Sequence, residues 1–189
     1  GDKIINQMKR LGTSVDWNVS RFTMDEGLSY SVKEVFIDLY NRGLIYKDKR
    51  LVNWDPKLGT ALSDLEVNQI EKVGKMWFIK YQLENSTENI VVGTTRPETI
   101  FGDSGIAIHP KNKKLNHLIG KKATIPILNK SIPIFADEYA DPEKGSGAVK
   151  ITPAHDFNDF EIGKKHDLEF VNILDKSANL NKNTPKEYQ

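Results

Sequence analysis

The sequence contains no cysteine, and this removes several chemistries from consideration. The chain can form no disulfide, use no thiolate nucleophile and hold no zinc ion through cysteine ligands. It also has no apolar run near the ~20 residues needed to span a bilayer, and no signal-peptide core at its amino terminus. We therefore expect a protein of a reducing compartment, placed in the cytoplasm, with no membrane partner and no metal site.

An excess of charge of either sign is also absent. The 189 residues include 27 Lys and Arg and 26 Asp and Glu, which gives a net charge of +1. The length suffices for a hydrophobic core, and a charged fraction of 28% is typical of a globular protein. Because the chain begins with glycine rather than methionine, we expect a segment of a longer polypeptide.

Two segments near the amino terminus have the periodicity of amphipathic helices. Apolar residues recur at helical spacing from Asp2 to Leu11. A second helix is predicted from about Asp25 to Asn41, with capping residues at its start and Gly43 just after its end. We therefore predict that residues 1–45 form a helical connecting segment.

Short strands dominate the sequence after this segment. The predicted strands cover residues 44–46, 50–54, 77–83, 90–92, 106–108, 124–128, 131–135 and 148–151. The pair at 124–128 and 131–135 predicts a hairpin, and Pro126 and Pro133 place its arms at sheet edges or bulges. Many short strands with few helices predict an α/β fold class, with a β-rich barrel or closed mixed sheet over residues 46–189.

Polar side chains gather where the strand 148–151 meets a helix start. Pro153 ends the strand, and Asp156 is a good N-cap for the helix that follows. Five side chains then lie at one end of two elements: Lys150, Thr152, His155, Asp156 and Asp159. Such a corner can bind a small polar ligand. The same residues also fit a structural role, in which the two aspartates cap the helix and Lys150 is solvated.

A second polar cluster lies in the turn after strand 90–92. Three threonines, Thr94, Thr95 and Thr99, accompany Arg96 and Glu98 around a proline. Hydroxyls both donate and accept hydrogen bonds, so this turn could surround a ligand that carries hydroxyls, an amine and an ester. An ordinary strand-to-helix turn capped by Thr95 explains these residues alone equally well.

Longer motifs decide between these interpretations. GTTRPETIFGDSGIAIHP (Gly93–Pro110) and GSGAVKITPAHDFNDFEIGKKHDL (Gly145–Leu168) resemble two signature segments of the editing domain inserted into the class I tRNA synthetases for valine, isoleucine and leucine. Within residues 11–67, DWNVSRFTMDEG and RLVNWDPKLGTALSDLEV are similar to the valyl-tRNA synthetase family rather than to its two relatives. The resemblance covers nearly the whole chain.

The resemblance implies an editing function without a synthetic one. The HIGH-type and KMSKS-type signatures of the class I ATP site do not occur here, so ATP and Mg²⁺ would serve only the parent enzyme and this chain would need no cofactor. The implied reaction is hydrolysis of the ester of threonine mischarged on valine tRNA. The implied partners are the aminoacylated 3′ end of that tRNA and the remainder of the parent synthetase. A non-catalytic fragment that binds tRNA or packs against its parent is the alternative.

The resemblance also implies roles for the two clusters. Asp159 would bind the α-ammonium group of the substrate, and Lys150 or Asp156 would recognise the threonine hydroxyl; these three are the predicted catalytic residues. The predicted substrate-binding residues are Thr94, Thr95, Arg96, Thr99, Thr152 and His155. Of these, His155 is open to two interpretations, a group that orients water or a structural histidine at the helix entrance.

Lysines cluster in the middle of this nearly neutral chain. They are Lys111, Lys113, Lys114, Lys121, Lys122 and Lys130. This local positive charge is expected to lie along the tRNA acceptor end, with the first five as the predicted tRNA-binding residues. A solvated lysine-rich surface is the alternative interpretation.

Overall fold

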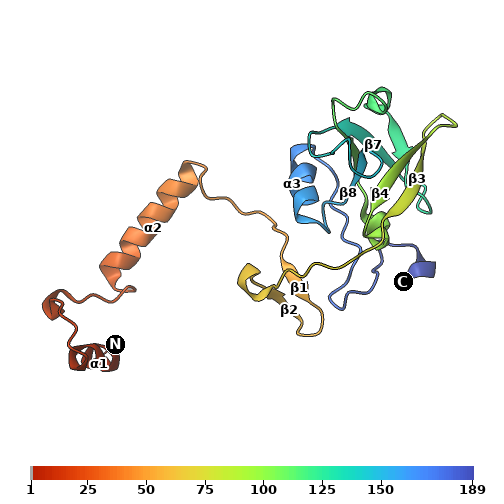
Figure 1. The fold of residues 1–189 in the computed structure, drawn as a ribbon. Helices are drawn as coiled ribbons and strands as arrows, with labels where there is room; N and C mark the ends of the chain where they lie inside the picture. The colour runs from red at the N-terminus through yellow and green to blue at the C-terminus, as the bar shows by residue number, and fades with distance from the viewer. Residues whose placement is uncertain (1) are drawn as a thin grey trace. The chain divides into compact units, whose positions relative to one another are not determined.

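The chain contains two compact units. The computed structural model describes residues 2–189, and Gly1, the first residue of the predicted connecting segment, lies outside the described residues. Contacts within the chain define a first unit that ends at Lys49 and a second unit from Arg50 to Gln189 (Figure 1). The predicted division into a connecting segment of residues 1–45 and an editing domain of residues 46–189 stays a prediction.

The first unit is helical. Its elements are α1 (Asp2–Arg10), the 3-10 turn η1 (Trp17–Val19) and α2 (Glu26–Asn41). Asp25 caps α2, because its Oδ1 accepts a hydrogen bond from Leu28 N at 2.8 Å. Both predicted helices are therefore confirmed. The apolar stripe of α2 is not buried, since Val32, Val35 and Phe36 are each more than half exposed.

A small hairpin opens the second unit. It consists of β1 (Asn53–Asp55) and β2 (Thr60–Leu62), which are antiparallel, and the 3-10 turn η2 (Asp64–Glu66) follows. The strand predicted at residues 44–46 is wrong, and the one predicted at 50–54 is correct only in its last two residues. Leu44 and Tyr46 are 66% and 76% exposed, and residues 44–52 pair with no strand of the described chain. An apolar run without a partner strand does not form a stable strand in water.

The other strands form one six-stranded sheet in the order β4-β3-β6-β7-β5-β8. They are β3 (Trp77–Leu83), β4 (Asn89–Thr94), β5 (Gly105–Ile108), β6 (Lys122–Thr124), β7 (Ser131–Ala136) and β8 (Ala148–Ile151). Neighbours are antiparallel except β5 and β7, which are parallel. The end strands β8 and β4 lie side by side, so the sheet is nearly closed (Figure 1). The predicted α/β fold with a barrel-like mixed sheet is confirmed.

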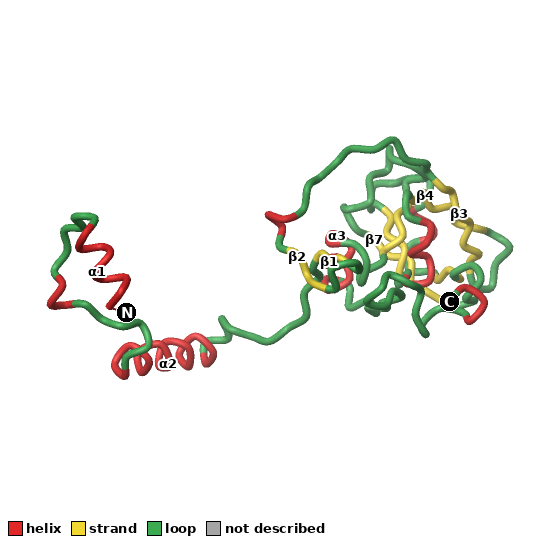
Figure 2. Tube along the Cα trace, turned by 90° about the horizontal axis from the view of Figure 1, so that it is seen from below, coloured by secondary structure: helices red, strands yellow, loops and turns green. Residues whose placement is uncertain are grey.

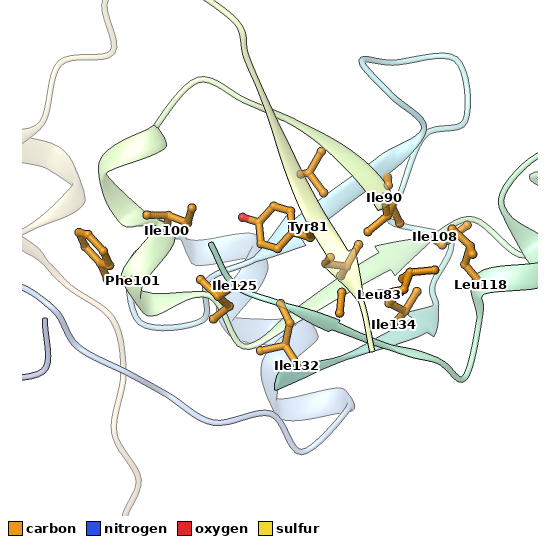
Figure 3. Packing of buried hydrophobic residues seen from close by; sticks show 14 of the residues in the cluster. Tyr81, Leu83, Ile90, Ile100, Phe101, Ile108, Leu118, Ile125, Ile132 and Ile134 are labelled. Atoms are coloured by element: carbon orange, nitrogen blue, oxygen red, sulfur yellow. The ribbon is translucent and has the colours of Figure 1, made fainter. Parts of the chain in front are cut away.

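Apolar side chains from the strands fill the inside of this barrel. Tyr81, Ile90, Ile108 and Ile134 come from four different strands, and each is at most 1% exposed (Figure 3). Burial alternates along β4, as expected for a strand with one face toward a core. In contrast, β5 is buried along its whole length, because both of its faces are covered. Ile106 and Ile108 face the main core, whereas Ala107 lies in a second apolar cluster against which Ile162 of α3 packs.

The predicted hairpin is confirmed, although its first strand lies earlier in the sequence. β6 ends at Thr124, so Pro126 lies in the turn. Pro133 lies in β7, which is an interior strand, and the edge position predicted for it is therefore wrong. The proline nitrogen carries no hydrogen, and no partner is missing there. Toward β6, the hydrogen bond is donated by the next residue, Ile134, whose N–H bonds Lys121 O. On the other side, pairing with β5 begins only at Ile134.

Short helices and long loops position the site. Besides η2, the helical elements of this unit are η3 (Pro97–Gly102), η4 (Asn116–Leu118), α3 (Phe157–Lys165) and η5 (Lys186–Tyr188). α3 follows β8 and packs against it. Close approach depends on Gly163, where an added Cβ would lie 2.7 Å from both Cβ and Cγ of Pro153. Figure 2 shows that loops make up much of this unit, and such loops commonly carry functional residues.

Candidate active site

A pocket of about 240 Å³ lies among segments that are far apart in the sequence. All nine predicted catalytic and substrate-binding residues line it: Thr94, Thr95, Arg96, Thr99, Lys150, Thr152, His155, Asp156 and Asp159. The other lining residues are Met76, Gly93, Tyr139 and Val149. The structure thus brings the two predicted clusters together, while the chemical role of each residue stays a prediction.

The turn after β4 forms one wall of the pocket through its own hydrogen bonds. Thr94 Oγ1 accepts from Arg96 N at 3.1 Å, and Thr99 Oγ1 donates to Arg96 O at 3.0 Å. Pro97 is the first residue of η3, and the N-cap is Arg96, without a side-chain cap. The interpretation in which Thr95 caps a helix is therefore wrong, and its exposed side chain lies at the pocket.

Arg96 joins the two walls. Its Nη1 donates to His155 O at 2.7 Å, across 59 residues of sequence, and its Nε lies 3.1 Å from the Glu98 carboxylate. The guanidinium of the first cluster therefore fixes the loop that connects β8 to α3. Together with the contact between β4 and β8, this hydrogen bond joins the two sequence motifs in one site.

The start of α3 forms the opposite wall. As predicted, Asp156 is the N-cap, since its Oδ1 accepts from Asn158 N at 2.8 Å and from Asp159 N at 3.1 Å. Asp159 does not cap the helix. Its Oδ2 accepts from Thr152 N at 2.8 Å, at the end of β8. The two aspartates therefore differ: Asp156 is exposed and caps α3, whereas Asp159 is 7% exposed and lines the pocket.

The electrostatic environment of Asp159 is unfavourable for an isolated carboxylate. Burial raises the pKa of Asp159 to about 6, and the neighbouring charges of Asp156 and Asp103 add to the rise. The hydrogen bond from Thr152 N and the charge of Lys150 oppose it. A buried carboxylate of this kind is stabilised by a cationic ligand, so the position suits an ammonium group.

A buried network that the sequence analysis missed lies behind the pocket. Asp103 is fully buried, and its Oδ1 accepts from Lys150 Nζ and from Thr152 Oγ1, both at 2.7 Å. Its Oδ2 accepts from the Tyr81 hydroxyl at 2.6 Å, and Lys150 Nζ donates further to Thr99 Oγ1 at 2.8 Å. Burial raises the pKa of Asp103, against the opposing effects of Lys150, Tyr81 and Thr152. With an exposed fraction of 6%, Lys150 is not the solvated residue of the structural interpretation.

One sequence signal could have pointed to Asp103. It lies two residues before the apolar segment Gly105–Ile108, which is predicted to be a buried strand. An acid in such a position is rarely buried unless it is paired, so Asp103 indicates a buried partner. Its two partners could not be predicted from the sequence. Lys150 lies 47 residues further along the chain, and Tyr81 has the position of an ordinary aromatic residue in a strand.

His155 is held by the backbone of a distant segment. Its Nε2 accepts a hydrogen bond from Ile173 N at 3.0 Å, which requires an unprotonated nitrogen. Burial lowers the pKa of His155, and the neighbouring charge of Arg96 lowers it further. The structural interpretation therefore fits His155 better than a role in orienting water.

Two further lining residues were also missed. Tyr139 lies beside the aspartates, and burial together with the charges of Asp159 and Asp156 raises the pKa of its hydroxyl. Met76 lies just before β3, and a Cβ on Gly93 would be 3.4 Å from its Sδ. Neither residue belongs to a recognisable motif, and only the folded chain places them at the pocket.

The predicted tRNA-binding lysines fall into two groups. Lys111, Lys113 and Lys114 are exposed and surround Asn112, whose Nδ2 donates to Gly147 O at 3.3 Å, next to β8. Lys121 and Lys122 are also exposed, but Lys121 lies 3.8 Å from Glu88, which precedes β4 and so lies at the end of that strand opposite Thr94. The first group therefore flanks a residue that is hydrogen-bonded to Gly147, two residues before Val149 of the pocket lining. Contact with tRNA stays a prediction for both groups.

Residues 2–189 contain no group of three or more His, Asp or Glu side chains arranged to hold a metal ion. Over the same residues, no helix combines the length and the apolar composition needed to cross a membrane.

Family models match both halves of the chain. Residues 1–113 match the family described as tRNA synthetases class I (I, L, M and V), and residues 112–189 match the family described as leucyl-tRNA synthetase, editing domain. The chain belongs to the class I tRNA synthetases.

Its curated relatives specify the type. The valine–tRNA ligase of Legionella pneumophila (strain Paris) is 57% identical over 189 residues, which cover 100% of this chain and 20% of that protein. The valine–tRNA ligase of Rhodopseudomonas palustris is 60% identical over 182 residues, covering 93% of this chain and 19% of that protein. A solved LeuRS complex from Agrobacterium radiobacter with tRNA and LeuAMS aligns over 98% of this chain and 33% of its own, at 19% identity and a TM-score of 0.47. The chain therefore includes an editing domain of the valine–tRNA ligase type and spans about 20% of the length of these ligases.

Proposed function

We propose that the second unit hydrolyses the aminoacyl ester of threonine mischarged on valine tRNA. The observation that carries this proposal is a single pocket that combines a buried carboxylate, Asp159, with a wall of threonine and lysine side chains. Within a longer ligase that charges tRNA with valine by means of ATP and Mg²⁺, such a pocket removes errors of the synthetic site.

The need for a second site follows from the shapes of the two amino acids. Valine and threonine are nearly isosteric, and an apolar synthetic pocket of a valine-specific synthetase is known to reject threonine only about 10²-fold. A polar pocket discriminates in the opposite direction, because a valine methyl group would leave its buried hydrogen-bonding groups unpaired. The wall formed by Thr99, Lys150 and Thr152 has this polar character.

Asp159 binds the α-ammonium group of the substrate in this proposal. The carboxylate is 7% exposed, and Thr152 N holds its Oδ2 at 2.8 Å, so its orientation is fixed before a ligand enters. A charge-assisted hydrogen bond from the ammonium offsets the cost of ionising this buried acid. The amino acid is thereby positioned with its side chain toward the polar wall.

The chemical step needs little more than positioning. An aminoacyl ester is already activated, so a water molecule held near its carbonyl suffices, and no protein nucleophile is required. Thr94 and Thr95, in the turn after β4, line the pocket, and in this proposal their hydroxyls lie near the ester or the terminal ribose. Arg96 closes the pocket, because it is bonded to the loop that contains His155.

The test is hydrolysis of valine tRNA that carries threonine, with the same tRNA carrying valine as the second substrate. We expect rapid loss of threonine alone from the wild-type chain, and loss of this activity in Asp159→Asn. Glu161→Gln is the matched control, since Glu161 is an exposed acid on the same helix and does not line the pocket. Absence of hydrolysis by the wild-type chain, or full activity of Asp159→Asn, contradicts the proposal.

The first unit supports a second, non-catalytic function. Several apolar side chains of α2 are largely exposed, with Val32 at 65%, Val35 at 58% and Tyr40 at 63%. Such a group of exposed apolar side chains is unusual on a surface that faces only solvent. Packing of this helix against the remainder of a parent synthetase would cover them. The test is amide hydrogen exchange of α2 with and without the remainder of a valine–tRNA ligase. If the chain hydrolyses neither ester and the amides of α2 exchange more slowly when that remainder is present, the packing function is the better supported one.

A further inference from the structure

The buried side of the pocket has a fixed pattern of hydrogen-bond donors and acceptors. The three protons of the Lys150 ammonium are directed at Thr99 Oγ1, Asp103 Oδ1 and Thr152 Oγ1. The Thr152 hydroxyl donates its own proton to Asp103, and the Thr99 hydroxyl donates to the backbone carbonyl of Arg96. No proton of these side chains remains for a ligand, whereas each hydroxyl oxygen keeps one lone pair.

Asp103 determines this pattern. It is fully buried, and both of its oxygens accept hydrogen bonds, with the Tyr81 hydroxyl on the side away from Lys150. Burial and the adjacent carboxylate raise the pKa of Tyr81, so its hydroxyl stays protonated and can only donate to Asp103. If Lys150 turned toward the pocket, the Asp103 carboxylate would lose its counter-charge in the protein interior, which is strongly unfavourable.

We propose that Asp103 is a positioning residue that makes this wall of the pocket a hydrogen-bond acceptor. The inference rests on the proposed function, because it takes the ligand to be an aminoacyl ester whose side chain carries a hydroxyl group. That hydroxyl donates its proton to Thr99 Oγ1 or Thr152 Oγ1, and Lys150 does not contact it. Specificity for threonine then depends on a proton of the substrate and not only on its polarity.

A fluorinated ester tests this directional recognition. Valine tRNA is acylated with threonine, with valine, or with 2-amino-3-fluorobutyrate, in which fluorine replaces the hydroxyl and cannot donate. Rates are measured with the chain and corrected for spontaneous hydrolysis. We expect the fluorinated ester to be hydrolysed as slowly as the valine ester. Hydrolysis of the fluorinated ester at the threonine rate means that the proton of the substrate hydroxyl is not needed, and the proposal is then wrong.

Substitution of the positioning residue tests its cause. In Asp103→Asn we expect the ratio of threonine-ester to valine-ester hydrolysis to fall by up to about tenfold, as for loss of one hydrogen bond between neutral groups. Asp137→Asn is the matched control, because Asp137 is also a buried acid, lies 2.7 Å from Lys165 Nζ, and does not line the pocket. An unchanged ratio in folded Asp103→Asn overturns the proposal.

Tyr81→Phe keeps the test valid if Asp103→Asn does not fold. It removes one hydroxyl and retains the ring in the core, and we expect a fall of about three- to tenfold in the same ratio. An unchanged ratio in this variant also counts against the proposal.

A spectroscopic measurement needs no hydrolysis. A buried, fully bonded ammonium exchanges protons slowly, so Lys150 should give a ¹H–¹⁵N signal that Lys150→Met removes. We expect this signal to be lost in Asp103→Asn, to broaden in Tyr81→Phe and to persist in Asp137→Asn. A signal that persists in Asp103→Asn refutes the positioning role. If the wild-type chain hydrolyses none of the esters, the proposed function fails, while this signal still decides whether Asp103 holds Lys150.

Discussion

Replacement of Asp159 by asparagine should make the second unit more stable while abolishing hydrolysis. Burial raises the pKa of Asp159 from 3.8 to about 6 in the folded chain. Because the folded-state pKa exceeds the unfolded-state value, the stability that comes from the neutral carboxyl is fully present below 3.8 and is lost as pH rises through about 6. Near neutral pH, the wild-type chain therefore folds with an unfavourable charge.

The magnitude follows from the shift. A difference of about two pKa units, at about 1.4 kcal/mol per unit, gives a cost of about 3 kcal/mol for the ionised side chain. Asparagine has nearly the same shape, and its carbonyl oxygen can still accept the hydrogen bond from Thr152 N. We expect Asp159→Asn to raise the free energy of unfolding by up to about 3 kcal/mol at about pH 7.5, and by roughly half of that at about pH 5.

Hydrogen exchange is the suitable assay, because the chain has two units and a single unfolding transition is not assured. Amides of β5 lie in the core of the second unit, and their protection reports its opening. Wild type and variant are compared at the same pH, with Glu161→Gln as the control that should change nothing. The reasoning would be refuted if the β5 amides of the variant are no more protected than those of wild type at about pH 7.5. It would also be refuted if the variant gains the same protection at about pH 5 as at about pH 7.5.

Three other predictions follow from the site and the fold. If ionised Asp159 binds the ammonium group as proposed, kcat/KM for hydrolysis should rise with pH through an apparent pKa near 6, and a flat profile between about pH 5 and 7 contradicts this role. Gly163→Ala should lower the free energy of unfolding by about 1–3 kcal/mol, because the new Cβ would lie 2.7 Å from Pro153; a stabilised variant, as for an ordinary helix glycine, shows that this contact is not tight. Reversal of charge at Lys113 and Lys114 should weaken hydrolysis of mischarged tRNA at low salt more than at high salt, and equal kinetics across salt concentrations indicate a solvated surface instead.

Local signals predicted much of this structure correctly. The capping acids Asp25 and Asp156 marked the starts of α2 and α3, because an N-cap depends only on the next few residues. Strand β3 and strand β8 were likewise found, since β-branched and aromatic residues alternate or cluster between turn residues. The run at residues 44–46 failed for the opposite reason. It has the composition of a strand, but no partner strand of the described chain lies beside it.

The sequence motifs predicted the residues that line the pocket on two sides, but they did not predict the buried network around Asp103. Asp103 meets Lys150 because β5 and β8 pair antiparallel with Ile106 opposite Lys150, and Ser104 N donates to Ile151 O. A shift of that register by one residue would turn Lys150 to the other face of the sheet and leave Asp103 without a counter-charge. No motif encodes this register, which is set by the packing of the whole barrel. The nine predicted site residues, which line the pocket, can therefore be read from two short segments. The contact between Asp103 and Lys150 depends instead on a strand pairing that only the complete fold determines.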